Sequence, residues 1–362
     1  MTVTVDHKSL QALVARIYEK LGVPAQDART AAEIAVASDL RGVDSHGVVM
    51  LPRKVDYMRR GLIEPKPQST VERETPATAL LNGGNGLGSV AGKRAMEICI
   101  QKAKAVGAGF VAVHDSNHYG IAGYYSMMAL EHDMIGISMT NTTPIVVPTF
   151  GRKAILGTNP LSVAAPAGEE RPFVLDMATS IVPSGKMTVF RNQGKSIPAG
   201  WAIDSEARAM TDPAEVTNML YSRTGGGLLP LGGAGEEFGG HKGYGLTFMA
   251  DIFSGILSGA AFGPFVYPSK DGKQSPGNVG HFFSALAVDA FRPLDDFKQT
   301  MDAMIRALKD TPKVPGQDRI YIHGEKEFEI EAERRRNGIP LHDQVAAALR
   351  ELAQDLEVDY NL

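Results

Sequence analysis

Val113-His114-Asp115-Ser116-Asn117-His118-Tyr119-Gly120 joins an apolar run to a predicted helix. The run from Phe110 to Val113 predicts a buried strand, and residues 121–130 predict a helix. A polar, glycine-containing loop at a strand end is where α/β proteins place catalytic groups. Two imidazoles, a carboxylate, a hydroxyl, an amide and a phenol lie together here. The stretch therefore predicts half of an active site.

The other half is predicted at Asp44-Ser45-His46-Gly47. Asp44 or Ser45 can cap a helix that runs from about His46 to Arg60 and ends at Gly61. The partial positive charge at a helix N-terminus favours a neutral imidazole near pH 7. A neutral His46 at this position would suit proton transfer.

Helical patterns dominate both ends of the chain, and strand patterns are concentrated in the middle. The predicted helices cover 7–21, 25–40, 46–60, 89–105, 121–130, 244–257, 294–309, 328–337 and 342–358. The predicted strands cover 78–81, 110–113, 134–139, 160–165, 173–176, 281–289 and 319–323. We expect an α/β chain with a central sheet domain over 75–290. Residues 1–74 and 291–362 would form a discontinuous, mainly helical domain.

The composition excludes several classes of protein. The 362 residues carry a net charge of −4, so neither nucleic acid nor an anionic membrane is expected as a partner. No apolar run reaches the roughly 18 residues of a membrane span. Cys99 is the only cysteine, which excludes an intramolecular disulfide and cysteine-rich metal sites. The start of the chain has no signal-peptide pattern, so a cytoplasmic location is expected.

The glycine-rich stretches do not match the dinucleotide fingerprint Gly-x-Gly-x-x-Gly. Gly84, Gly86 and Gly88 have the wrong spacing, and after Gly233 and Gly235 the third glycine comes one residue late. The chain also lacks a P-loop. A Rossmann nucleotide site is therefore not expected.

Several candidate site residues could also have a purely structural role. His114 and His118 are four residues apart, which suits a metal on a helix, but they follow a strand and no metal site is expected. They can instead be loop histidines bonded to backbone. Lys242 at a helix start can bind an anion or be a solvated lysine. Asp176 at a strand end can accept bonds from ribose hydroxyls or cap a helix.

Six stretches together resemble the type 2 malate/L-lactate dehydrogenases, whose fold is unrelated to that of Rossmann malate dehydrogenases. Each match is weak alone, but they span most of the chain in one order. They are Arg41-Gly42-Val43-Asp44-Ser45-His46-Gly47, Ser116-Asn117-His118-Tyr119-Gly120, Gly157-Thr158-Asn159-Pro160, Asp176-Met177-Ala178-Thr179-Ser180, Leu229-Pro230-Leu231-Gly232-Gly233 and Gly239-Gly240-His241-Lys242-Gly243-Tyr244-Gly245.

The resemblance implies a largely antiparallel or mixed sheet of non-Rossmann type that binds NAD or NADP. It implies a homodimer and hydride transfer between nicotinamide C4 and C2 of a small 2-hydroxy or 2-oxo acid. His118 and His46 match the acid/base histidines, and Ser45 and Asn117 match substrate-binding positions. The matching nucleotide contacts are Thr142, Asp176, Met177, Ala178, Lys242, His323, Gly324 and Glu325.

The chain departs from several members of the family at two substrate positions. Those members have arginine four residues after the first histidine and tyrosine four residues later, whereas this chain has Met50 and Lys54. A 2-hydroxy acid carries a carboxylate that needs a cationic partner. We hypothesise that Arg53 or Lys54 supplies this charge.

The expected activity is that of a malate or L-lactate dehydrogenase. Within the family, the alternatives are a reductase of another oxo or imino acid and a ureidoglycolate or sulfolactate dehydrogenase. A metal-dependent hydrolase or lyase could instead use His46, His114, Asp115 and His118. A third alternative is a ligand-binding protein that binds nucleotide without hydride transfer.

Overall fold

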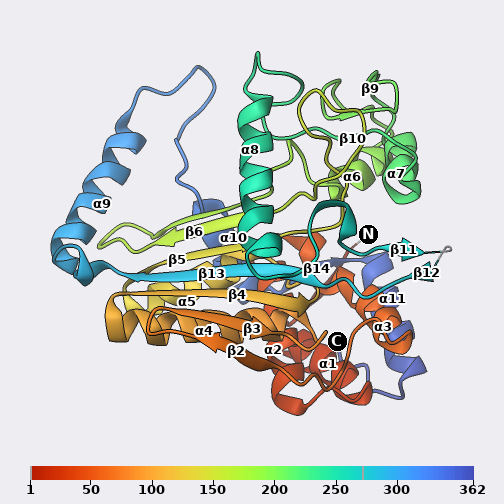
Figure 1. Cartoon of the computed structure of the whole chain (residues 1–362), viewed down its shortest axis with the longest axis horizontal. Helices are drawn as coiled ribbons and strands as arrows, with labels where there is room; N and C mark the ends of the chain where they lie inside the picture. Colours follow the sequence, from red (N-terminus) through yellow and green to blue (C-terminus); the bar gives the residue numbers. More distant parts are fainter. Residues whose placement is uncertain (1, 271–272) are drawn as a thin grey trace.

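Seven strands form a central sheet in the computed structural model, which describes residues 2–270 and 273–362 (Figure 1). Their order is β2-β3-β4-β13-β5-β6-β7. The bounds are β2 Thr70–Glu74, β3 Thr78–Asn82, β4 Ala108–Ser116, β13 Val279–Ala287, β5 Met134–Thr140, β6 Leu161–Ala165 and β7 Phe173–Met177. β3 and β4 are parallel, and every other neighbouring pair is antiparallel. This confirms the expected mixed, largely antiparallel sheet and explains the missing fingerprint, which belongs to parallel βαβ units.

Helices α4 (Gly88–Val106) and α5 (Ala122–Met128) cover one face of this sheet (Figure 1). Cys99 lies in the apolar cluster between them and the sheet, as a buried core thiol. β13 is inserted between β4 and β5, so that His281 is opposite both Val113 and Thr140. The strand that leads to His118, β4, is therefore paired along one edge with a strand about 165 residues further along the chain.

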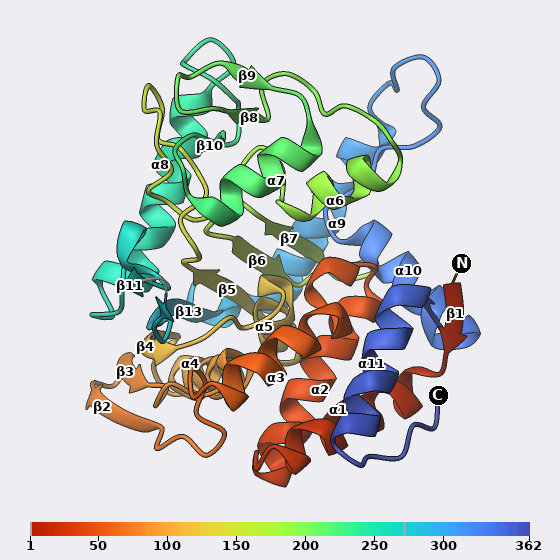
Figure 2. The same ribbon diagram turned by 90° about the vertical axis from the view of Figure 1, so that its right-hand side faces the viewer.

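The two ends of the chain share a second apolar core. Helices α1 (His7–Lys20), α2 (Ala25–Leu40), α3 (Leu51–Arg59) and α11 (Asp343–Asp355) lie side by side (Figure 2). Strand β1 (Thr2–Val5) pairs with β14 (Ile339–His342). Helix α10 (Glu325–Asn337) lies beside α2, whereas α9 (Leu294–Asp310) lies at the far end of the sheet (Figure 1). The division into 1–74 plus 291–362 and 75–290 stays a prediction, although β2 at its boundary pairs with the central sheet.

A smaller lobe lies beyond the other face of the sheet (Figure 2). It contains α6 (Gly185–Asn192), α7 (Pro213–Ser222) and three short strands, β8 (Ala202–Ile203), β9 (Ala209–Met210) and β10 (Gly227–Leu228). Helix α8 (Gly240–Asp251) continues into a π-helical turn over Ile252–Ile256. Within residues 2–270 and 273–362, no helix has the length and apolar character needed to cross a membrane.

The predicted helix from His46 to Arg60 is wrong at its start. Residues 44–46 and 48–50 form two short 3₁₀ turns, and α3 begins only at Leu51. Pro52 lacks an amide hydrogen and is tolerated only in a first helical turn, so a helix cannot begin at His46 and run through it. A side chain at Gly47 is also excluded, because its Cβ would lie 2.0 Å from the buried Asp39 carboxylate.

Three other predictions need correction. β4 continues to Ser116, so His114 and Asp115 belong to the strand and the loop begins at Asn117. Residues 319–323 do not form a strand, although Val174 of β7 donates a backbone bond to His323. The strands predicted from the sequence also do not include β2, β8 and β9.

Candidate active site

A cavity of about 840 Å³ lies between the 3₁₀ turns before α3, the loop after β4, the ends of β5 and β7, and the start of α6. Its wall brings together residues from sequence positions 41 to 327. The predicted site residues on this wall are Ser45, His46, Arg53, His118, Thr142, Asp176, Met177, Ala178, His323 and Gly324. The structure therefore brings most of the predicted site into one cavity.

Four predicted site residues are not on this wall: Asn117, Lys54, Lys242 and Glu325. Asn117 is buried, and its amide nitrogen donates to the carbonyls of Asn85 and Gly86. Lys54 follows Arg53 in α3 and is buried. Lys242 is exposed near the start of α8. The roles predicted for these residues, including those for Asn117 and Lys242, stay predictions.

The loop that carries His118 is fixed by close backbone packing. A Cβ at Gly88 would lie 1.7 Å from the carbonyl oxygen of Asn117, so the first turn of α4 can press directly against this loop. Gly120 has φ +95°, a left-handed conformation that favours glycine. The loop can therefore present the His118 ring at the cavity wall while its backbone stays buried.

The two predicted catalytic histidines face each other. The ring centroids of His46 and His118 are 5.5 Å apart, and the rings are stacked at 29°. Burial lowers the pKa of His46, with contributions from Arg53 and Lys54. Burial also lowers the pKa of His118 well below its ordinary value, and the neighbouring His46 adds to the effect. Both rings are neutral near pH 7 for these reasons, and not because of a helix N-terminus at His46.

Each ring has one nitrogen engaged by a neighbour. Ser45 Oγ is 2.9 Å from His46 Nδ1. The backbone N–H of Gly120 donates to His118 Nδ1 over 3.3 Å, which is a long hydrogen bond. Nε2 of each ring is left for proton exchange with a ligand.

Lys54 is a buried cation without an anion. Its side chain is 8% exposed, and no ion pair or hydrogen bond to it is recorded in the described part of the chain. Burial lowers its pKa to about 8, and the adjacent Arg53 contributes. Burying an unpaired charge is costly, so an incoming carboxylate would compensate for what the protein does not supply.

Asp176 provides an acceptor at the opposite side of the cavity. Its Oδ2 accepts the backbone N–H of Gly123 over 2.7 Å. The Asp176 carboxylate opens into the cavity. Burial raises its pKa to about 6, and the positive charge of Arg41 opposes this rise. Arg41 itself is buried, pairs with Glu331 at 3.1 Å and packs on Phe328. No local sequence pattern distinguishes Arg41 as a site residue, because its contacts come from distant segments.

Glu325 supports the turn at residues 322–324 and does not reach the cavity wall. It pairs with Lys309 of α9 at 2.5 Å and with Arg319 at 3.3 Å, and it accepts the Ile322 backbone N–H. Because its carboxylate is already engaged, Glu325 anchors the turn that places His323 and Gly324 on the wall.

A third histidine, His281, lies in the centre of the sheet, and the sequence analysis did not single it out. Its Nδ1 is 2.7 Å from Thr140 Oγ1, and its Nε2 is 2.8 Å from Ser116 Oγ. The ring stacks on Tyr119, with centroids 4.7 Å apart and the planes at 4°. Burial lowers its pKa to about 3, so it stays neutral. His281 therefore supports the strands on either side of it.

We expect His281→Leu to lower the free energy of unfolding by about 2–3 kcal/mol at pH 7, because buried hydroxyls lose their partner. Urea denaturation measures this, with the exposed His132→Leu as the control. The folded-state pKa is below the ordinary 6.5, so this stability is present above pH 6.5 and is lost as the pH falls toward 3. The difference between wild type and variant should therefore narrow in acid. A difference below 0.5 kcal/mol (roughly the scatter of surface substitutions) at pH 7 would contradict the assignment.

The structure provides no ligand set for a metal-dependent mechanism. His114 is in β4 and its Nε2 is 3.0 Å from the carboxylate of Glu72. Across the ranges 2–270 and 273–362, no group of three or more histidine, cysteine, aspartate or glutamate side chains could hold a metal ion. His46 and His118 would need partners that His114 and Asp115 do not provide at the cavity wall.

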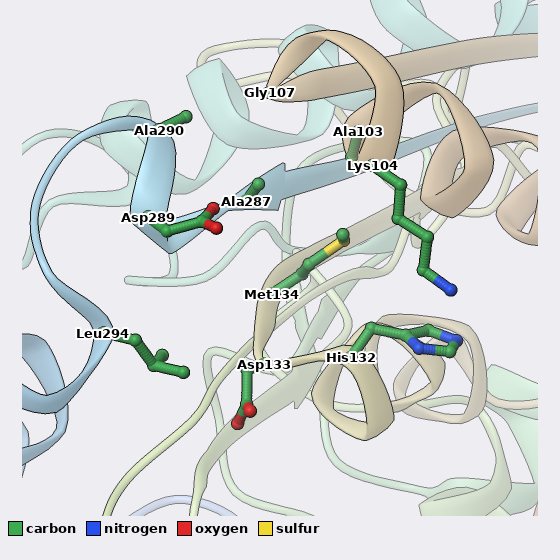
Figure 3. A pocket seen from close by; sticks show the side chains of 10 residues that line it. All are labelled: Ala103, Lys104, Gly107, His132, Asp133, Met134, Ala287, Asp289, Ala290 and Leu294. Carbon is green, nitrogen blue, oxygen red and sulfur yellow. The ribbon is translucent and has the colours of Figure 1, made fainter.

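A second hollow, of about 520 Å³, lies at the other end of the sheet, where α4 ends and α9 begins. Figure 3 shows Lys104 and His132 at one end and Asp289 and Leu294 at the other. Lys104, His132 and Asp289 are exposed, and Asp133 pairs with Lys298 at 2.6 Å. Nothing in its lining resembles the buried cations and imidazoles of the larger cavity.

Comparisons with known proteins show which family the chain is similar to. The family model described as malate/L-lactate dehydrogenase matches residues 5–350. Malate dehydrogenase of Pyrococcus horikoshii is 48% identical over 357 residues, which cover 99% of this chain and 96% of that protein. A malate/(S)-sulfolactate dehydrogenase of Methanothermus fervidus is 37% identical, with 96% and 97% covered. The crystal structure of malate dehydrogenase from Entamoeba histolytica aligns with a TM-score of 0.96 at 37% identity, over 100% of both chains.

Proposed function

The chain belongs to the malate/L-lactate dehydrogenase family, and we propose that it transfers a hydride between NAD(P) and C2 of malate or a related 2-hydroxy acid. The observation that carries the proposal is the stacked pair His46 and His118, both with a lowered pKa, beside Arg53 and the unpaired Lys54. This arrangement offers a proton acceptor and the Arg53 cation on one cavity wall, with Lys54 next to Arg53 in α3.

His118 is the proposed proton-transfer group for the C2 oxygen. To accept a proton at Nε2, the neutral ring must carry its proton on Nδ1. That tautomer gives up the 3.3 Å contact from Gly120, a loss of about 1 kcal/mol at most. His46 stacks on the ring that becomes charged, so the two imidazoles titrate as a coupled pair and only one is expected to hold the extra proton.

The residues of the cavity fit a nicotinamide dinucleotide. The volume of about 840 Å³ is in the range of ligand pockets, about 300–1,000 Å³. One oxygen of Asp176 is engaged by Gly123, and the other has no recorded partner in the described chain, so it can accept ribose hydroxyls. Thr142, Met177, Ala178 and the turn at 323–324 are the other proposed contacts. When bound, the nicotinamide supplies or accepts the hydride.

Two cations serve the substrate in this proposal. Arg53 lies on the cavity wall, and Lys54 follows it in α3. Ser45 next to His46 adds a hydroxyl, and Asn117 holds the catalytic loop. A substrate with a second anionic group, such as malate or sulfolactate, can use both cations, whereas lactate can use only one. Ureidoglycolate and cyclic imino acids stay as alternatives within the same chemistry.

A homodimer is part of the proposal. Phe248, Ile252 and Ile256 are exposed and spaced four residues apart along α8 and the π-helical turn, and Phe262 and Phe265 are exposed beside each other. Large exposed apolar side chains on one helix face are typical of a protein interface. The cytoplasmic location stays a prediction, and the choice between NAD and NADP is left to the next experiment.

A substrate and cofactor panel tests the proposal. We expect oxaloacetate to be reduced with a kcat/KM at least about tenfold above that of pyruvate, because a second carboxylate paired with a buried cation is worth more than 1.4 kcal/mol. The measurement follows reduced-nicotinamide absorbance with malate, sulfolactate, lactate and both oxo acids, each with NAD(H) and NADP(H). Activity that survives a chelator excludes the metal-dependent alternative. Absence of turnover with every pair would contradict the proposal.

A further inference from the structure

A segment far along the chain holds the end of β4 and the catalytic loop that follows it. Tyr267 and Asn278 flank the strands β11 (Ser269–Lys270) and β12 (Lys273–Gln274). The backbone N–H of His118 donates to the Tyr267 hydroxyl oxygen over 3.2 Å. The backbone N–H of Asp115 donates to Asn278 Oδ1 over 2.8 Å. Two side chains from one segment thus fix the backbone on either side of Ser116 and Asn117.

The backbone of this segment is left-handed at both contacts, and at Tyr267 it is strained. Tyr267 has φ +50° and Asn278 has φ +41°, and Asp115 opposite them has φ +50°. The left-handed conformation costs a bulky residue such as tyrosine about 1–2 kcal/mol. Such strain persists only where the surroundings demand it, and it is concentrated at functional sites. The Tyr267 ring also requires glycine beside it, since a Cβ at Gly277 would lie 2.4 Å from the ring.

The Tyr267 hydroxyl lies among the groups of the site. Burial raises the pKa of Tyr267 to about 12, and the nearby Arg53 opposes the rise. The hydroxyl therefore keeps its proton at neutral pH. Its oxygen accepts from His118, and no acceptor for its proton is recorded among residues 2–270 and 273–362. The oxygen is therefore available as the acceptor that holds the His118 backbone.

We propose that Tyr267 is a positioning residue for proton transfer, whose hydroxyl fixes the His118 backbone, and that Asn278 fixes the end of β4 from which the same loop leaves. This inference rests on the proposed function, because it concerns the histidine to which that function assigns the proton. It adds that the imidazole is held in place from a segment about 150 residues further along the chain. The conformation of the loop then depends on two side-chain oxygens, one from Tyr267 and one from Asn278.

The first test is Tyr267→Phe, which keeps the ring against Gly277 and removes only the oxygen. We expect kcat to fall about tenfold, since small misplacements of a catalytic group are costly, with little change in the Kd of the reduced cofactor. Tyr360→Phe is the matched control, because it removes a hydroxyl that bonds Ala346 in the terminal helices. Wild-type kcat in Tyr267→Phe would overturn the proposal.

The second test separates the acceptor from the backbone at residue 278. Asn278→Gly keeps the left-handed conformation and removes the acceptor, whereas Asn278→Asp keeps both. We expect a several-fold loss of kcat in the glycine variant and recovery in the aspartate variant. A merely structural role predicts loss of thermal stability in Asn278→Gly with kcat unchanged, and that result would overturn the proposal.

Hydrogen exchange tests the contacts without relying on activity. The peptide spanning 115–120 should exchange about tenfold faster at the His118 amide in Tyr267→Phe, and at the Asp115 amide in Asn278→Gly. Unchanged exchange in both variants would overturn the proposal. If the wild type shows no dehydrogenase activity, the proposed function fails, while exchange still decides whether this segment holds the loop.

Discussion

His118→Ala is expected to lower kcat by about 10²–10⁴-fold, the usual contribution of a positioned acid or base. The His118 ring lies at the cavity wall, burial keeps it neutral near pH 7, and its backbone is fixed by Gly88, Tyr267 and neighbouring turns. The variant loses the proton acceptor but leaves the cofactor contacts in place. Steady-state kinetics and the Kd of the reduced cofactor separate these effects, and the Kd should change little.

His114→Ala is the matched control for this prediction. His114 is four residues away in β4, but it bonds to Glu72 and does not line the cavity. We expect its kcat to stay within about twofold of wild type. Near-normal turnover in His118→Ala, together with a large loss of turnover in His46→Ala, would assign the proton-transfer role to His46 instead. A large loss in His114→Ala would favour the metal-based alternative.

Local patterns predicted most of the fold. The helices at 7–20 and 25–40 and the strands from β3 to β7 lie within a few residues of the predicted positions, because apolar spacing is a local property. The helix from His46 failed because Pro52 must lie in a first helical turn, and the Val48 N–H donates to the Asp39 carboxylate, which is a tertiary contact. The pairing of β13 with β4 and β5 could not be predicted from local patterns, because these strands are far apart in the sequence.

The site was predictable where functional groups are clustered in sequence. His46, His118, Asp176 and the 323–324 turn all line the cavity, in agreement with their motifs. Tyr267, Asn278 and Arg41 were missed, because their roles depend on contacts between distant segments. The sequence indicated that Lys54 is unusual, but only the structure shows that it is buried and has no anionic partner among the described residues.

Lys54→Met is expected to raise the KM for oxaloacetate by about 100-fold, since loss of one member of a buried charged pair costs about 2–5 kcal/mol. The cofactor Kd should be unaffected. Lys54→Arg keeps the charge and should retain most of the affinity. Lys8→Met, an exposed lysine in α1, is the control for general effects. An unchanged KM in Lys54→Met would leave Arg53 as the carboxylate partner.

The same substitution should stabilise the free enzyme. Lys54 has a folded-state pKa of about 8 against an ordinary value of 10.5, an interval that corresponds to about 3 kcal/mol of penalty for the buried charge. The penalty is present below pH 8 and fades as the pH rises toward 10.5, so Lys54→Met should gain most at neutral pH. Any misfit of the methionine side chain at this buried position reduces the gain in the free energy of unfolding.

Wild-type KM should therefore be constant below about pH 8 and rise above it, as Lys54 loses the proton that binds the acid. Lys54→Arg should flatten this rise, because its guanidinium stays charged. A lysine that only filled space would give neither effect, and its removal would not raise stability and KM together. If Lys54→Met raises both the stability and the KM, Lys54 is a substrate-binding residue that destabilises the free enzyme, and the substrate supplies the anion that it lacks.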